Sequence, residues 1–212
     1  MTKLHEGQMV LTHGAPLAPK GKARNAVIML HGRGASAYDI LSLSTYLDQE
    51  RTAFMAPQAA NSAWYPQRFI EPVTQNEPWL SSALGVIAGL VQQANDAGIP
   101  TERIFLLGFS QGACLSLEFA ARHPAQYGGV FGLSGALIEN GDVPREYAGS
   151  LHGTPVFLGC SDVDFHIPLA RVNRSAEVLQ ALGGVVTKRI YPGLGHSVNE
   201  DEIEFIRNSL KS

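Results

Sequence analysis

The chain has 212 residues, of which 45% are hydrophobic and 17% are charged, and its formal net charge is −3. This length and composition exclude a disordered chain and predict one domain over residues 1–212 with a substantial core. Lys and Arg form no cluster and no apolar run reaches transmembrane length, so we expect a soluble, cytoplasmic protein with no nucleic-acid partner and no membrane insertion.

Short apolar runs alternate with longer segments of helical period, which is typical of a parallel sheet wrapped by helices. Strands are predicted at Ala26 to Leu30, Thr52 to Ala56, Ile104 to Leu107, Gly129 to Leu133, Thr154 to Gly159 and Val185 to Tyr191, with an additional edge strand near Gln8 to Thr12. Helices are predicted at about Ala37 to Gln49, Trp79 to Ala97, Gln111 to Arg122, Leu169 to Leu182 and Asn199 to Leu210. The sequence therefore predicts an α/β fold with a mostly parallel sheet covered on both faces.

The segment from Pro57 to Pro78 is a long connection with four prolines and several aromatic residues. Loops of this length inside a domain are often functional, and loops after the strands of an open α/β sheet form its ligand crevice. Trp64, Tyr65 and Phe69 are therefore candidates for a substrate wall. The alternative, that these aromatic residues only pack back onto the sheet, is equally compatible with the sequence.

Two cysteines, Cys114 and Cys160, lie in a predicted helix and at a predicted strand end. A small apolar thiol packs well at such positions, so we expect buried free thiols rather than a disulfide. The histidines lack the spacing of a zinc motif, so no metal is expected.

The central motif is Gly108-Phe109-Ser110-Gln111-Gly112, which follows an apolar strand and precedes a helix. A G-x-S-x-G turn in this setting lifts its serine to the edge of the sheet, and a Cβ at either glycine would collide with neighbouring backbone. The motif alone is weak, but the strand before it and the helix after it are the context that it requires. Ser110 is therefore the predicted nucleophile.

A serine nucleophile needs a base, and the order in this kind of fold is Ser, then an acid, then His. His166 and His196 satisfy that order, and we favour His196 because Gly195-His196 lies in a loop between the last strand and the last helix. For the acid, Asp162 and Asp164 both follow the strand that ends at Gly159, and the residues alone do not separate them. One of the two is expected to orient the histidine and the other to cap the turn.

The early loop His31-Gly32-Arg33-Gly34 follows the first buried strand, where the second donor of an oxyanion hole is expected. We predict that the backbone N–H groups of Arg33 and Gln111 form this hole, with Gly32 close to the substrate. The Arg33 side chain offers a second hypothesis, because a planar guanidinium suits a substrate carboxylate. An exposed or locally paired arginine is the competing interpretation.

These segments, together with Asp164-Phe165-His166-Ile167-Pro168, resemble the phospholipase/carboxylesterase family of the α/β-hydrolase superfamily nearly from end to end. The resemblance implies a hydrolase of the α/β-hydrolase fold with no cofactor and no large cap domain. It also selects Asp164 as the acid, because the family's acid stands four residues before a proline, here Pro168. The chain departs from the family at Arg33 and Ala35, where members often carry Leu and Asp, and at Tyr65-Pro66 after the tryptophan. These departures concern the substrate side of the site.

We therefore expect a serine carboxylesterase that hydrolyses small to medium carboxylic esters with the triad Ser110, His196 and Asp164. Its expected partner is a small-molecule ester, and a homodimer is left open. One alternative is an acyl-protein thioesterase or lysophospholipase, which would need a long apolar channel. The other is a non-catalytic α/β-hydrolase that binds a small ligand, against which the complete set of Ser, Asp, His and oxyanion loop argues.

Overall fold

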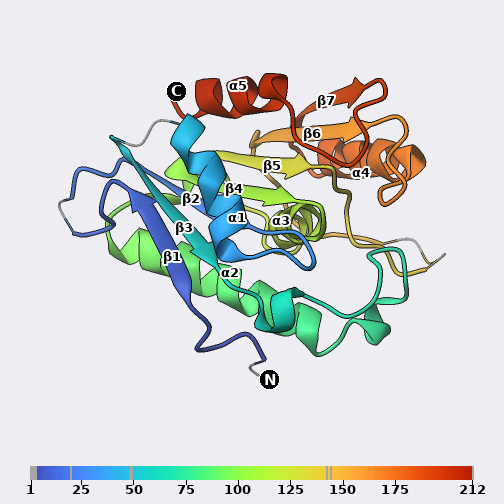
Figure 1. Cartoon of the computed structure of the whole chain (residues 1–212), viewed down its shortest axis with the longest axis horizontal. Coiled ribbons are helices and arrows are strands. Elements are labelled where there is room, and N and C mark those ends of the chain that lie inside the picture. The colour runs from blue at the N-terminus through green and yellow to red at the C-terminus, as the bar shows by residue number, and fades with distance from the viewer. Residues whose placement is uncertain (1–3, 20, 48–49, 142, 144, 212) are drawn as a thin grey trace.

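The computed structural model describes residues 4–19, 21–47, 50–141, 143 and 145–211. Its centre is one seven-stranded sheet with the order β1-β3-β2-β4-β5-β6-β7 (Figure 1). Strand β1 runs antiparallel to β3, and all the other neighbouring strands are parallel. The strands are β1 (Val10–Gly14), β2 (Asn25–Leu30), β3 (Thr52–Pro57), β4 (Ile104–Phe109), β5 (Gly129–Leu133), β6 (Pro155–Ser161) and β7 (Val185–Tyr191).

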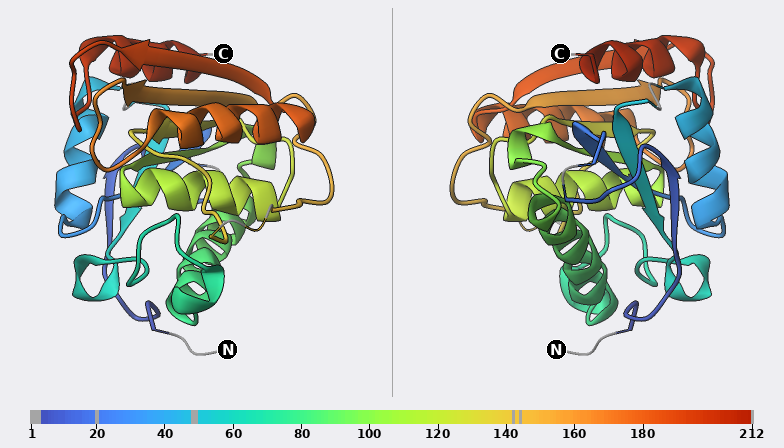
Figure 2. Two further views of the ribbon diagram at one scale, coloured as in Figure 1. Left: turned by 90° about the vertical axis from the view of Figure 1, so that its right-hand side faces the viewer. Right: turned by 90° about the vertical axis from the view of Figure 1, so that its left-hand side faces the viewer.

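Five α-helices cover the two faces of this sheet (Figure 2). They are α1 (Ala37–Leu41), α2 (Trp79–Asp96), α3 (Gln111–Arg122), α4 (Leu169–Ala181) and α5 (Glu200–Ser209). Helices α1 and α5 pack on one face, and α2, α3 and α4 pack on the other, so each face has its own apolar core. The central strands β2 to β5 are buried almost throughout, as continuous apolar runs predict. The predicted fold class is confirmed.

All the predicted elements except the helix from Ala37 to Gln49 match those of the structure within two residues at each end. The edge strand lies at Val10–Gly14 instead of Gln8 to Thr12, where Val10 pairs with Pro57 and Gly14 pairs with Ala53 of β3. Strand β6 runs to Ser161 because Ser161 still pairs with Tyr191 of β7.

The exception is the predicted helix from Ala37 to Gln49, which is α-helical only to Leu41 and continues as a 3₁₀ turn over Ser42–Tyr46. The hydroxyls of Ser42, Ser44 and Thr45 each donate to the carbonyl oxygen three residues earlier. Such bonds compete with regular helix pairing and tighten the turn. The predicted end at Gln49 lies outside the described residues.

Candidate active site

Ser110 lies at the sharp turn between β4 and α3, at the carboxyl edge of the sheet. Its φ of 55° and ψ of −118° fall in a sparsely populated backbone region, and its N–H donates to the carbonyl of Leu133. A Cβ built on Gly108 would lie 2.2 Å from the backbone of Gly112, and one on Gly112 would lie 2.0 Å from the carbonyl oxygen of Leu30. Both glycines are therefore needed so that α3 can approach β2 and β4 closely enough to hold the strained serine.

Three side chains form a continuous line of hydrogen bonds at this edge. The Ser110 hydroxyl lies 2.8 Å from Nε2 of His196, and Nδ1 of His196 lies 2.7 Å from Oδ2 of Asp164. With Nδ1 carrying the proton, Nε2 is the free acceptor for the serine proton. Asp164 is only 8% exposed, and its other oxygen accepts the backbone N–H groups of His166 and Ile167. The carboxylate is thus fixed in place by bonds that leave one oxygen for the imidazole.

The other two candidates, Asp162 and His166, have different positions. Asp162 is exposed and accepts the backbone N–H of Gly193 at 2.8 Å, so it anchors the loop that carries His196 instead of contacting the imidazole. The structure therefore separates the two aspartates that the residues alone left open. His166 is exposed too, and its ring packs against the ring of His196 with a centroid distance of 4.7 Å.

Two backbone N–H groups lie at this site without an acceptor among the described residues, those of Arg33 and Gln111. Gln111 is the first residue of α3, where free N–H groups and the helix dipole favour negative charge. Arg33 stands in the loop after β2, and the neighbouring Gly32 lies against Ser110, since a Cβ built on it would be 3.3 Å from that of Ser110. The arrangement suits a developing oxyanion near the serine.

A cavity of about 310 Å³ opens beside Ser110. Of the predicted substrate-side residues, Gly32, Tyr65 and Phe69 line it. The full lining comprises Gly32, Arg33, Ala35, Tyr65, Arg68, Phe69, Phe109, Ser110, Gln111, Cys114, His166, Ile167 and His196. Most of this lining is apolar, as in ligand pockets generally, and its volume is at the small end of their range.

Trp64 is the exception among those residues, because it is fully buried and does not line the cavity. Its indole N–H donates to the carbonyl of His31, and its backbone N–H donates to the side chain of Gln111. The Gln111 side chain also donates to the carbonyl of Tyr65. Trp64 is thus part of the scaffold behind the cavity wall, and the Gln111 side chain joins that wall to α3.

Two buried histidines, His5 and His31, bond to the backbone of the loop that precedes and includes Trp64. His5 lies 2.9 Å from the carbonyl of Trp64 through Nε2, and its Nδ1 accepts the backbone N–H of Ala60. His31 accepts the N–H of Ala59 through Nε2, and its Nδ1 lies 2.8 Å from the carbonyl of Gly32. Each ring therefore donates one hydrogen bond and accepts one, which requires neutral imidazoles. Burial lowers the pKa of both His5 and His31, in agreement with this state.

The Arg33 side chain does not extend freely into the cavity, as the carboxylate hypothesis required. Its two terminal nitrogens donate to the carbonyl oxygens of Pro66 and Gln67, at 2.8 and 2.6 Å. A planar fork suits two adjacent acceptors, here in the chain's own loop. Arg33 is therefore locally paired, as the competing interpretation expected, and its guanidinium holds the loop at Pro66 and Gln67 in place.

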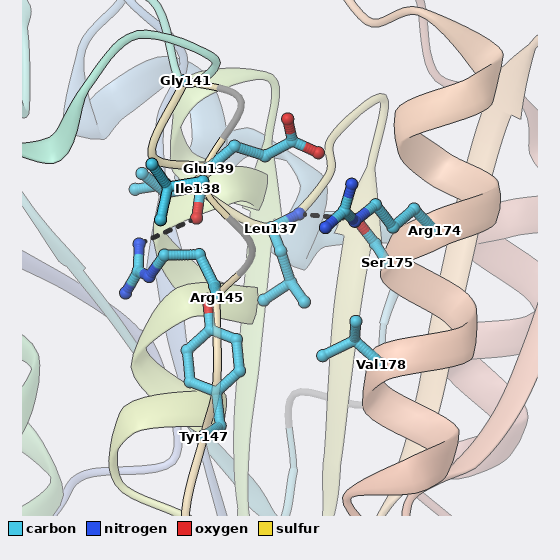
Figure 3. A pocket seen from close by; sticks show the side chains of 10 residues that line it. Leu137, Ile138, Glu139, Gly141, Arg145, Tyr147, Arg174, Ser175 and Val178 are labelled. Atoms are coloured by element: carbon cyan, nitrogen blue, oxygen red, sulfur yellow. Dashed lines mark hydrogen bonds between the residues drawn. The ribbon is translucent and has the colours of Figure 1, made fainter.

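A second cavity, between the segment after β5 and helix α4, has a volume of only about 20 Å³ (Figure 3). Figure 3 shows Arg145 donating to the carbonyl of Ile138, and the N–H of Leu137 donating to the hydroxyl of Ser175. This space is enough for about one water molecule. It has no triad residue in its lining and does not compete as a substrate site.

Among the described residues, no group of three or more His, Cys, Asp or Glu side chains is arranged to hold a metal ion. No helix in the described ranges is long and apolar enough to cross a membrane. The prediction of buried free thiols is confirmed for Cys114 and Cys160, and burial raises the pKa of each thiol to about 12.

The parallel sheet, its helices on both faces and the serine turn after β4 define an α/β-hydrolase. Residues 13–212 match the phospholipase/carboxylesterase family, and the chain belongs to that family. Its relatives are named as acyl-protein thioesterases and carboxylesterases, so the chain belongs with enzymes that hydrolyse ester or thioester bonds.

Three known proteins illustrate this relationship. Acyl-protein thioesterase 1 of Saccharomyces cerevisiae is 30% identical over 90% of this chain and 95% of the yeast protein. A probable carboxylesterase of Arabidopsis thaliana, described as SOBER1-like, is 25% identical over 89% of this chain and 79% of the plant protein. The crystal structure of a phospholipase/carboxylesterase from Dyadobacter fermentans superposes with a TM-score of 0.91 and 39% identity, covering 100% of this chain and 99% of that chain.

Sequence reasoning missed several residues of the site. Phe109, Cys114 and Ile167 line the cavity, but apolar positions of this kind look like ordinary core in a sequence. Arg68 also lines it, and its place in the loop with Tyr65 and Phe69 was the available signal. The hydrogen bonds of His5 and of the Gln111 side chain join segments 46 to 59 residues apart, which no local pattern indicates.

Proposed function

We propose that this chain is a serine carboxylesterase that hydrolyses small to medium carboxylic esters through an acyl-enzyme on Ser110. The observation that carries the proposal is the line from Ser110 through His196 to Asp164, with hydrogen bonds of 2.8 and 2.7 Å, beside two unpaired N–H groups. Such a line activates a hydroxyl that is otherwise a poor nucleophile. The small cavity favours short and medium acyl groups.

The reaction has two steps. His196 takes the Ser110 proton on Nε2 as the serine oxygen attacks the ester carbonyl, and Asp164 stabilises the imidazolium that forms. The N–H groups of Arg33 and Gln111 bind the oxyanion of the tetrahedral intermediate. His196 then gives its proton to the leaving alcohol, which departs. In the second step, water attacks the acyl-enzyme by the same route, and the acid is released while Ser110 regains its proton.

A second candidate is an acyl-protein thioesterase, which the name of the 30% identical yeast relative favours. The chemistry at Ser110 would be the same, because a thiolate replaces the alkoxide as the leaving group. The two candidates differ in acyl length. An activity profile that rises toward palmitoyl thioesters, with little activity on short esters, would favour the thioesterase; a maximum at short and medium esters would favour the carboxylesterase.

Labelling with a fluorophosphonate tests the proposed nucleophile. We expect intact-mass spectrometry to show a single adduct on the wild-type chain, mapped to the peptide that contains Ser110. Ser110→Ala should remain unmodified, whereas Ser197→Ala, which removes an exposed hydroxyl next to His196, should react like the wild type. A folded wild-type chain that stays unmodified would contradict the proposal.

A further inference from the structure

The cavity beside Ser110 has two arginines in its lining and, among the described residues that form it, no Asp or Glu. Arg33 and Arg68 supply the positive charge, and His166 adds an imidazole next to His196. The chain as a whole carries a formal charge of −3. The cavity is thus a local positive site on a chain of opposite net charge, and such a site attracts anions.

The guanidinium of Arg68 is free to bind an anion in this cavity. Its side chain is exposed at the cavity, and no described residue forms a hydrogen bond or an ion pair with its guanidinium. Its backbone is held in place, because its carbonyl accepts hydrogen bonds from the N–H of Glu71 and the side chain of Asn76. A fixed backbone with an unpaired planar fork suits an incoming carboxylate or phosphate.

Arg33 fixes the segment that carries Arg68. Its bonds to the carbonyls of Pro66 and Gln67 fix the two residues that precede Arg68. The backbone N–H of Gln67 in turn donates to the side chain of Asn76, the residue that also holds Arg68. The segment with Arg68 is therefore tied to the oxyanion loop on one side and to buried Asn76 on the other, which limits the entropy lost when a ligand binds.

We propose that the cavity takes an ester that carries an oxyanionic group, a carboxylate or a phosphate, and that the guanidinium of Arg68 binds this group. Arg33 adds charge and holds the loop. The inference rests on the esterase function proposed above, because the ester bond must reach Ser110 while the charged group reaches Arg68. It names the class of substrate and leaves the chemistry at Ser110 unchanged.

Matched pairs of esters test this proposal. Methyl butyrate against monomethyl succinate places a carboxylate on the acyl part, and propyl acetate against β-acetoxypropanoate places it on the alcohol part. Propyl acetate against acetoxyethyl phosphate tests a phosphate. We expect the wild type to prefer the charged member of at least one pair by about tenfold or more in kcat/KM, the scale of one charge-assisted hydrogen bond. The preference should shrink as salt is added.

The variants assign this preference to Arg68. Arg68→Gln should lower kcat/KM for the preferred charged ester by about tenfold and leave the neutral ester within about twofold, while Arg68→Lys keeps part of the preference. Arg174→Gln is the matched control, because Arg174 is also exposed and lies outside the site at Ser110, and no described residue forms a hydrogen bond or an ion pair with its guanidinium. It should behave like the wild type.

The inference fails if the wild type prefers the neutral member of every pair, or if Arg68→Gln lowers the charged and the neutral member equally. Either result leaves the proposed esterase function standing, provided that neutral esters are hydrolysed and Ser110 reacts with fluorophosphonate. If no ester is hydrolysed and Ser110 does not react, the proposed function fails, and the inference fails with it.

Discussion

The two neutral histidines behind the cavity wall predict how the stability of the fold depends on pH. His5 and His31 are 2% and 1% exposed, and each uses one ring nitrogen to accept a backbone N–H, that of Ala60 or Ala59. A proton on that nitrogen would replace the acceptor with a donor and break the bond. Burial lowers the pKa of both rings below the ordinary value of 6.5, so the unfolded chain takes up protons first as the pH falls.

The size of the effect follows from linkage. The full stabilisation by the neutral pair is present above the unfolded pKa of 6.5 and is lost as the pH falls below it toward the folded pKa of each ring. Each histidine that is protonated only in the unfolded chain adds about 1.4 kcal/mol per pH unit to the slope of the unfolding free energy, so the pair adds up to about 2.7 kcal/mol per pH unit. A charge on the His5 ring also lowers the pKa of His31, because the two positive charges repel each other.

Urea denaturation at a series of pH values between about 8 and 5 measures this slope. We expect the wild type to lose stability steeply below about pH 6.5 and the variant with His5→Gln and His31→Gln to lose it less steeply, although it starts lower. His152→Gln, which replaces an exposed histidine, should keep the wild-type slope. Equal slopes in the wild type and the double variant would refute the assignment of two neutral buried imidazoles.

Three further predictions concern single carboxyl and amide groups. Glu202 is fully buried, and burial raises its pKa to about 7, so its ionisation destabilises the fold as the pH rises from 4.5 through 7. Glu202→Gln should therefore raise the free energy of unfolding by up to about 3 kcal/mol at about pH 8 and leave it unchanged near pH 4.5, as measured from urea midpoints. Gln111→Ala should lower the free energy of unfolding by about 2–4 kcal/mol and raise KM, because it leaves the N–H of Trp64 and the carbonyl of Tyr65 unpaired. An unchanged urea midpoint would argue against a stabilising role of these two hydrogen bonds. Asp164→Asn should lower kcat by about 10⁴-fold, whereas Asp162→Asn, which loses only a loop contact, should stay within about tenfold; similar losses in both would contradict the assignment of the acid.

The fold was predictable because its signals are local. The apolar runs that became β2, β4 and β5 are continuous in sequence, and the turn at Ser110 carries its glycines next to the serine. Where a side-chain hydroxyl bonds to the backbone, as at Ser42, the predicted α-helix ended earlier than expected. These effects depend on which groups bond to each other, and hydrophobic period does not report that.

The site was predictable in part for the same reason. Ser110, Asp164 and His196 could be chosen from motif, order and family resemblance, and the structure brings them into one line of hydrogen bonds. The side chains of Arg33 and Trp64 were not predictable, because their partners are backbone carbonyls of distant segments. An arginine or tryptophan in a sequence shows the chemistry that it offers, and only the fold shows which group accepts it.

Rapid quenching of the wild type during turnover of an activated acetate ester shows whether Ser110 carries the acyl group. We expect peptide mass spectrometry to find one acetyl group on the peptide with Ser110, formed and lost at rates that match turnover. We expect no such adduct in Ser110→Ala. Steady hydrolysis by the wild type with no acyl group on Ser110, or with the acyl group on another residue, would contradict the proposed acyl-enzyme.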